Sequence, residues 1–121
     1  MQRDDAAIVD MLDFARDILV FTAGLDERAF AASRVAQAAV LHRLMLLGEA
    51  VRRVSDQACL AHPEIPWKGV SGQRNVLIHD YDEVELQWVW MVVDNDIPAL
   101  IAVLEPIVSG IERGLSHSTL D

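Results

Sequence analysis

The sequence predicts an all-α protein, an up-and-down bundle of four main helices with short helical turns between them. Glycine (6 residues) and proline (4) are scarce and only 6% of the 121 residues are aromatic, which favours helix over sheet. Apolar residues recur at steps of three and four along most of the chain, the period of a helix with one buried face. With 52% hydrophobic residues, the chain can build a core. We therefore expect a single domain over residues 1–121, with its core at about 4–115 and a frayed C-terminal tail.

The first helix is predicted over about residues 4–22. Its acidic and basic side chains fall mostly opposite an apolar face. That face consists of Ile8, Met11, Leu12, Ala15, Ile18 and Leu19. Gly24 is expected to stop this helix. Asp26 then has the position of an N-cap for a short helical turn around residues 27–30.

A long helix is predicted next, over about residues 33–60. Its apolar positions include Val35, Ala38, Ala39, Leu41, Met45, Leu46, Val51 and Val54. Gly48 lies in the middle, where glycine costs about 1 kcal/mol relative to alanine. A close approach by another helix, such as one across a dimer, would explain a glycine there.

In the rest of the chain, proline residues predict where helices end or bend. Pro63 and Pro66 end the long helix, and a short segment from residue 67 to about residue 79 follows. Residues 80–82 are expected to form a loop, and Asp82 with Glu85 has the spacing of a capping box that begins the last helix. Pro98 predicts a kink near residues 94–95. Gly110 or Gly114 is expected to end this helix.

Charge and cysteine content restrict the classes of function. The formal net charge is −9, so a whole-surface attraction for nucleic acid is excluded and any RNA contact needs a local basic cluster. Seven of the ten Lys and Arg residues lie between Arg28 and Arg74, which leaves a basic face open. The single cysteine, Cys59, cannot form an internal disulfide. The polar N-terminus and the lack of a long apolar run favour a cytoplasmic protein without a membrane span.

The strongest chemical signal is the segment from Arg74 to Tyr81, which reads RNVLIHDY. Arginine is always charged and can donate two parallel hydrogen bonds to a phosphate. Histidine can take or give a proton near neutral pH, and His79 follows Arg74 by five residues. The two residue types together suit phosphodiester chemistry without a metal, although the spacing alone also occurs in proteins with no such activity.

Other polar residues have simpler interpretations. His42 is interpreted as a packed or surface histidine. Arg52 and Arg53 are interpreted as a solvated face that could also line an RNA path. The three tryptophans, Trp67, Trp88 and Trp90, are expected in the core or an interface. The four histidines and one cysteine lack the spacing of a metal site, so no metal is expected.

The order of several segments resembles one known family. Along the chain they are Gly24-Leu25-Asp26, Gly48-Glu49-Ala50, His62-Pro63-Glu64-Ile65-Pro66-Trp67, the motif from Arg74 to Tyr81, and Asn95-Asp96-Ile97-Pro98. They resemble the HepT-like branch of the HEPN superfamily, the toxin halves of MNT/HepT toxin–antitoxin pairs. The resemblance covers about residues 4–104.

The resemblance implies a homodimeric helical bundle in which the motifs of two subunits face a shared cleft. It implies a metal-independent ribonuclease that needs no cofactor, with Arg74 and His79 catalytic and Asn75 supporting them. It also implies a nucleotidyltransferase partner of the MNT type, the antitoxin, which would use ATP and Mg²⁺ to transfer AMP to Tyr81. Asp80 departs from the family, in which glycine is common at this position.

A second departure lies in the long helix, where Arg43 and Met45 replace the Asn and Glu that are frequent in the family. Two alternatives to a ribonuclease toxin remain open. The chain could be a non-catalytic helical partner that binds a nucleotide or presents a substrate to a nucleotidyltransferase. It could also be a dimeric interaction module whose active site has decayed, which Asp80 would suit.

Overall fold

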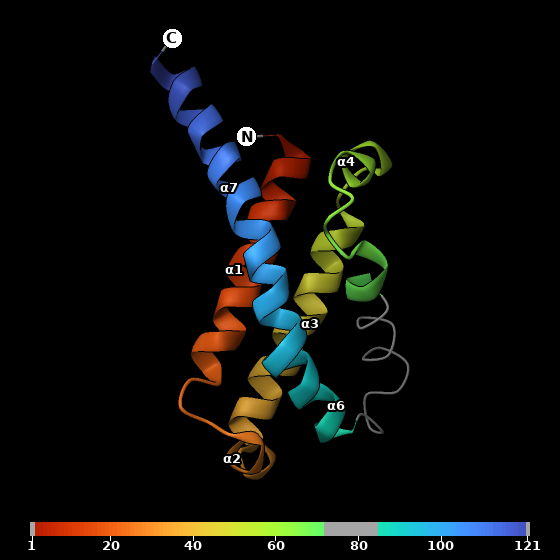
Figure 1. The fold of residues 1–121 in the computed structure, drawn as a ribbon, viewed down its shortest axis with the longest axis vertical. Coiled ribbons are helices and arrows are strands. Elements are labelled where there is room, and N and C mark those ends of the chain that lie inside the picture. Colours follow the sequence, from red (N-terminus) through yellow and green to blue (C-terminus); the bar gives the residue numbers. More distant parts are fainter. Residues whose placement is uncertain (1, 72–84, 121) are drawn as a thin grey trace.

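The computed structural model describes the backbone of residues 2–71 and 85–120 and the side chains as far as residue 114. These residues contain helices and no strand, so the predicted all-α class is confirmed. The elements are α1 (Arg3–Phe21), α2 (Glu27–Ala32), α3 (Arg34–Arg52), α4 (Asp56–Ala61), α6 (Leu86–Met91), the π-helical turn η2 (Val92–Asp96) and α7 (Ile97–Leu120). Figure 1 shows α1, α3 and α7 side by side along the long axis, with α2 at one end of the bundle.

Helix α1 lies at the centre of this arrangement and packs against both α3 and α7. The predicted apolar face is the buried one, apart from Leu19, which is 36% exposed. The helix ends where it was expected to end. The hydroxyl of Thr22 donates a hydrogen bond to the carbonyl oxygen of Ile18 (2.9 Å), and Gly24 adopts a φ of 77°, which residues with a Cβ rarely adopt.

Side-chain caps begin the next two helices. The Asp26 carboxylate accepts a hydrogen bond from the backbone N–H of Ala29 at 2.8 Å, so the predicted N-cap of α2 is confirmed. The Ser33 hydroxyl accepts from the N–H of Ala36 at 3.1 Å and begins α3 in the same way. These two side-chain caps determine the residues at which α2 and α3 begin.

The prediction of one long helix over residues 33–60 was wrong at its C-terminal end, because α3 ends at Arg52. The chain turns at residues 53–55, and Ser55 begins α4 by accepting a hydrogen bond from the N–H of Ala58 at 3.2 Å. Asp4 of α1 holds Ser55 in place. Its carboxylate accepts from the Ser55 N–H (2.8 Å) and the Ser55 hydroxyl (2.7 Å).

The predicted kink before Pro98 takes the form of the π-helical turn η2. The N–H of Ile97 donates to the carbonyl oxygen of Val92, five residues earlier. Proline has no N–H, and in a regular α-helix its ring would clash with the carbonyl four residues before it. The wider turn relieves this clash at Asp94, and α6, η2 and α7 follow one another without a loop.

Two predicted boundaries of this last helical segment were wrong. Glu85 is the N-cap residue of α6 and makes no side-chain capping bond, so it cannot be the third helical residue of a capping box; Asp82 lies outside the described residues. Gly110 and Gly114 do not end α7, which extends to Leu120. Neither glycine has the positive φ that a helix-ending glycine needs.

The core lies between α1, α3 and α7 and reaches the segment before the predicted motif. Its largest fully buried side chains are Phe30, Ile8, Met11, Leu12, Ile18, Leu44, Leu47, Ile65, Ile97, Leu104 and Val40. Ion pairs between helices join its outer edges: Arg16 with Glu105 (3.5 Å) and Arg53 with Asp10 (2.8 Å). Among the described residues, no helix is both long enough and apolar enough to cross a membrane.

Candidate active site

The four residues predicted to carry out or regulate catalysis lie outside the described residues. They are Arg74, Asn75, His79 and Tyr81, and the assignment of their roles stays a prediction. The structure does describe the two chain segments that lead into and out of this motif. It also describes two hollows next to the first of these segments.

The segment before the motif is anchored in the core. Ile65 is 2% exposed and Val70 is 4% exposed, so both ends of the turn at residues 66–69 are held by buried side chains. The indole N–H of Trp67 donates to the carbonyl oxygen of His62 (2.9 Å), which fixes the ring although its face is only half-buried. The backbone of residues 67–71 is helical. The chain therefore enters the predicted motif from a rigid support.

The segment after the motif is anchored equally well. Val89 of α6 is fully buried, and Trp88 and Trp90 pack against the core. The Trp90 ring lies with its centroid 5.5 Å from that of Phe30, tilted by 38°, an arrangement that stabilises aromatic pairs. The expectation that Trp67, Trp88 and Trp90 pack in the core or an interface is confirmed for the core.

One groove lies between the end of α3, α4 and the turn at residues 67–71. Its volume is about 430 Å³. We call it the basic groove, because Arg52 and Lys68 enter it from different elements. Its lining residues are Val51, Arg52, Val54, Asp56, Cys59, Trp67, Lys68 and Ser71. In the described part of the chain, no carboxylate pairs with Arg52 or Lys68.

Cys59 adds no negative charge to the basic groove at neutral pH. Partial burial, followed by the charges of Asp56 and Asp4, raises the pKa of its thiol above the ordinary value for cysteine. The thiol is half-buried and stays protonated. Asp56 is therefore the one negatively charged residue among the described residues that line the groove.

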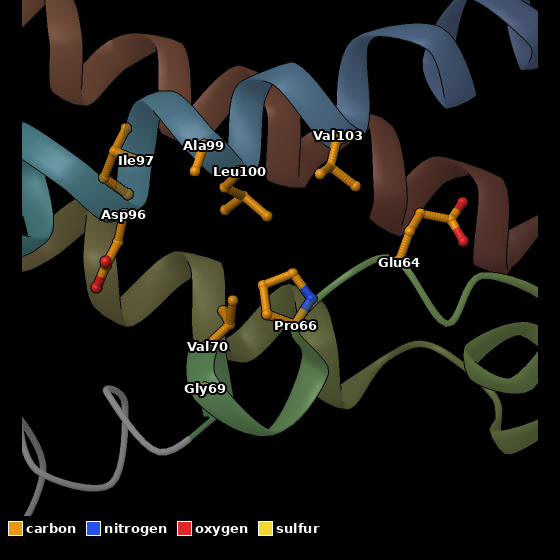
Figure 2. Close-up of a pocket in the computed structure, with 9 residues that line it drawn as sticks. All are labelled: Glu64, Pro66, Gly69, Val70, Asp96, Ile97, Ala99, Leu100 and Val103. Atoms are coloured by element: carbon orange, nitrogen blue, oxygen red, sulfur yellow. The ribbon is translucent and has the colours of Figure 1, made fainter.

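A second hollow lies on the other side of the same turn, between residues 64–70 and the start of α7 (Figure 2). It has a volume of about 350 Å³, and its walls are apolar side chains. These include Pro66, Val70, Leu100 and Val103. Glu64 and Asp96 stand at its two ends (Figure 2), so this hollow does not suit a phosphate group.

Two other polar residues of α3, Arg43 and His42, make contacts within the bundle. The Arg43 guanidinium donates to Asp17 of α1 at 2.9 Å and lies 5.3 Å from the centre of the Phe21 ring. It also donates to the Nδ1 of His42 at 3.0 Å, and the His42 side chain is at the surface, as expected. Arg43 therefore connects α3 to α1 at the position where the family frequently has Asn.

No group of three His, Cys, Asp or Glu side chains in the described residues is placed to hold a metal ion. The Nδ1 of His62 lies 3.5 Å from a carboxylate oxygen of Glu64. Both residues belong to the turn that was expected from Pro63 and Pro66. Asp94 and Asp96 are both exposed, and neither is held by a described hydrogen bond that would prepare it for acid–base work.

Comparison with known proteins identifies the family. Residues 11–107 match the family described as Ribonuclease HepT-like, so the match includes both anchoring segments and the motif between them. The chain belongs to this family. The predicted resemblance is thereby confirmed, and so, at the level of the family, is the prediction of a ribonuclease.

Individual relatives have similar lengths. A protein of Methanocaldococcus jannaschii named as a putative RNase is 33% identical over 107 residues, which is 88% of each chain. The protein named Probable ribonuclease HepT of Thermococcus cleftensis is 33% identical over 87 residues, 72% of this chain and 79% of that one. A putative RNase of Caldanaerobacter subterraneus is 31% identical over 77 residues, 64% of this chain and 69% of that one. No solved structure matches the chain significantly.

Sequence reasoning missed one residue of this region, Lys68. It has no charged neighbour within two residues in the sequence, and it lies outside the segments that carry the family resemblance. Its importance arises only when the turn at residues 67–71 places it beside the end of α3. The clue available from the sequence was weak: a cation directly after the Pro63–Pro66 turn, six residues before Arg74.

Proposed function

We propose that this chain is the toxin of a toxin–antitoxin pair and that it cleaves RNA as a metal-independent endoribonuclease. The observation that supports this most strongly is the family match over residues 11–107, which encloses the segment from Arg74 to Tyr81. The relatives named as RNases support the same activity. Single-stranded RNA is the substrate class we expect, because its backbone and bases are accessible.

The chemistry requires only the side chains of the motif and the substrate's own nucleophile. A histidine base removes the proton from the ribose 2′-hydroxyl, and the 2′-oxygen forms a bond to phosphorus. The bond from phosphorus to the 5′-oxygen of the next nucleotide breaks, and a histidine acid protonates that leaving oxygen. The products are a 2′,3′-cyclic phosphate end and a free 5′-hydroxyl end.

Each residue of the motif has a role in this proposal. His79 transfers the protons, a contribution of roughly 10²–10⁴-fold in rate. Arg74 binds the phosphate and stabilises the extra negative charge of the pentacovalent state. Asn75 supports the phosphate contact. Two motifs in one cleft of a homodimer would supply two histidines, so that one acts as the base and the other as the acid.

Tyr81 is the proposed site of control. A nucleotidyltransferase antitoxin would use ATP and Mg²⁺ to transfer AMP to its hydroxyl, two residues from His79. The added group is bulky and negatively charged, and it would repel the RNA phosphates and block access to the motif. The partner, and not this chain, would therefore need the nucleotide and the metal ion.

The test is to induce the chain without any partner and to follow growth and total RNA integrity, beside the variants Arg74→Ala and His79→Ala. We expect growth arrest and RNA cleavage for the unmutated chain only, with cleavage by the purified protein unaffected by EDTA. His42→Ala is the matched control, because it removes an exposed histidine from α3 and should leave cleavage unchanged.

Other outcomes of this test would contradict the proposal in different ways. Cleavage by His79→Ala at the rate of the unmutated chain would exclude the proposed acid–base role. Intact RNA with all soluble variants would favour the alternative, a non-catalytic partner of a nucleotidyltransferase. The dimer is tested by mixing the two inactive variants. A shared cleft predicts that mixed subunits differ in activity from either variant alone, and a monomeric mass in sedimentation would exclude it.

A further inference from the structure

We propose that the basic groove binds the backbone phosphates of single-stranded RNA and leads the strand to the catalytic motif. Arg52 and Lys68 are the phosphate-binding residues in this proposal. The inference rests on the proposed ribonuclease function, since it names where that enzyme holds its substrate. It concerns residues to which neither the motif nor the family comparison gives a role.

The fold selects Arg52 from a pair of neighbouring arginines. Arg53 points to α1, where its guanidinium lies 2.8 Å from the carboxylate of Asp10. Arg52 is the last residue of α3 and lines the groove with an exposed side chain. The ion pair holds the Arg53 side chain against α1, whereas Arg52 has no described carboxylate partner.

Lys68 faces the same space from the other wall. It belongs to the helical turn at residues 67–71, and its side chain is exposed. Two cations on separate rigid elements can contact successive phosphates of one strand, which is how positively charged grooves follow a nucleic-acid backbone. Exposed amine and guanidinium groups that neutralise phosphates release the counterions condensed on the RNA, which favours binding at low salt.

The chain's other charges make this location distinctive. With a net charge of −9, most of the surface repels RNA, so binding depends on places where cations are unpaired. The second hollow next to the same turn has carboxylates at both ends, Glu64 and Asp96 (Figure 2). Comparing the described lining residues of these two hollows, the basic groove has two cations against the carboxylate of Asp56, and the second hollow has no cation.

Trp67 gives the groove an aromatic wall as well. Its ring lines the groove and is held by the hydrogen bond from its indole N–H to His62. Bases of a single strand stack on such rings with little sequence preference, and each stacked base contributes roughly 1–3 kcal/mol. A fixed aromatic ring beside two cations suits a strand of RNA better than an acidic peptide or a free phosphate ion.

The groove also lies close to the motif along the chain. Ser71 lines it, and Arg74 follows three residues later. RNA held by Arg52 and Lys68 would therefore lie beside the chain segment that leads into the predicted catalytic motif.

The experiment measures RNA binding directly, in the His79→Ala background, so that the substrate stays intact. Fluorescence anisotropy of a labelled single-stranded RNA gives the Kd between about 50 and 200 mM salt, with and without Arg52→Gln and Lys68→Gln together. The control pair is Arg28→Gln with Arg34→Gln, which changes the net charge equally. Arg34 begins α3, so the control lies about 27 Å along the helix from Arg52.

We expect the groove pair to weaken binding about tenfold at the lower salt concentration. Each lost phosphate contact also reduces the slope of log K against log salt by about 0.7, so the slope should fall by about 1.4. The control pair should change both quantities much less. Equal losses in the two pairs, unchanged binding in the groove pair, or no RNA binding by the His79→Ala protein with its groove intact would each overturn the inference.

Cleavage of the same RNA, with His79 intact, separates this inference from the proposed function. RNA that binds through the groove but is never cleaved would refute the ribonuclease while leaving the groove in place. RNA that is cleaved with the same KM by the unmutated chain and by the groove pair would refute the groove while leaving the ribonuclease in place. The expected result is a raised KM for the groove pair, with kcat changed less.

Discussion

At the scale of single residues, the pair formed by Asp4 and Ser55 connects two parts of the chain that are 51 positions apart. Asp4 lies in the first turn of α1, and Ser55 begins α4. The hydrogen bond from the Ser55 N–H lowers the pKa of the Asp4 carboxyl below its ordinary value, and the bond from the Ser55 hydroxyl is the next largest cause. The ionised carboxylate is therefore the form that the folded state favours.

This pair predicts a pH-dependent stability. Because the pKa of Asp4 is lower in the folded than in the unfolded state, its contribution is present above about pH 4 and is lost as the pH falls through the folded-state value. Asp4→Asn should remove this dependence. Ser55→Ala should also lose the cap of α4, about 1 kcal/mol. Urea unfolding from pH 3 to pH 7 measures both.

Asp13→Asn is the matched control, since Asp13 is an exposed carboxylate on the same helix. An Asp13→Asn protein should keep the pH dependence of the unmutated chain. If Asp4→Asn keeps it equally well, the bonds to Ser55 do not stabilise the folded state, and other contacts must hold the turn between α3 and α4.

These residues also show what a sequence can predict at this scale. Asp26 was identifiable as an N-cap because everything the cap needs is local: a helix stop at Gly24 and helix-forming residues after it. Ser55 was not, because serine also occurs inside helices and its partner Asp4 is distant in sequence. Arg52 and Arg53 could not be distinguished from the sequence either, because Arg53 gains its ion pair with Asp10 only through the packing of α1 against α3.

At the scale of elements, the two prolines of α7 occupy different environments. Pro98 lies two residues after the end of the π turn. In a regular α-helix its ring would clash with the carbonyl of Asp94, and the wider turn relieves this clash. Pro106 lies inside the regular part of α7, four residues after Ala102. The carbonyl oxygen of Ala102 therefore lacks the N–H donor that any other residue at position 106 would provide.

We predict that Pro106→Ala stabilises the protein, by on the order of 1–3 kcal/mol, because it restores that hydrogen bond and removes the ring. Pro98→Ala should change the stability much less, since η2 already accommodates the ring. Chemical denaturation of both variants beside the unmutated chain gives the comparison. A loss of stability in Pro106→Ala would contradict the predicted cost of Pro106, and equal gains in both variants would contradict the role of η2 in accommodating Pro98.

Element boundaries were predicted with uneven success for a physical reason. The start of α1, its end and the kink before Pro98 follow from strong local preferences, those of the apolar period, glycine and proline. The end of α3 does not, because the apolar pattern continues through Val51 and Val54 while the backbone turns. Gly110 shows the converse case: glycine permits a helix end without requiring one.

At the scale of the whole molecule, the fold class was predictable because one period runs through nearly the entire chain and fits only helices. The catalytic roles of Arg74 and His79 stay predictions, which rest on the type and spacing of two residues within one short segment. Their arrangement in space, and the shared cleft of a dimer, depend on contacts that no local pattern encodes; both stay predictions. The basic groove needed the fold, because α3 and residues 67–71 together form it.

The proposed transfer of AMP to Tyr81 predicts a covalent change that is visible in the mass of the whole chain. Co-expression with a nucleotidyltransferase of the MNT type should add one or more AMP units to the intact mass, and peptide sequencing should place them on Tyr81. The modified protein should no longer cleave RNA. Tyr81→Phe is the control, because it lacks the acceptor oxygen and should stay unmodified and active in the presence of the partner.

An unmodified chain after co-expression, or AMP on another residue, would refute this form of control while leaving the nuclease itself untouched. Tyr81 is the single tyrosine of the sequence, so a modified tyrosine cannot be misassigned. Serine, threonine and histidine remain detectable as other acceptors in the same experiment.

The π turn η2 also affects whether the chain can gain or lose one residue without rotating its last helix. Val89 and Val108 are both buried and 19 positions apart, so an uninterrupted α-helix, at about 100° per residue, would turn one of them about 100° away from the core. The wider turn at Val92–Asp96 absorbs about one residue, and the remaining 18 complete about five turns. A sequence with one residue fewer at this turn would present the same face through a plain α-helix. Evolution can therefore insert or delete a single residue at this turn without rotating α7 against its neighbours.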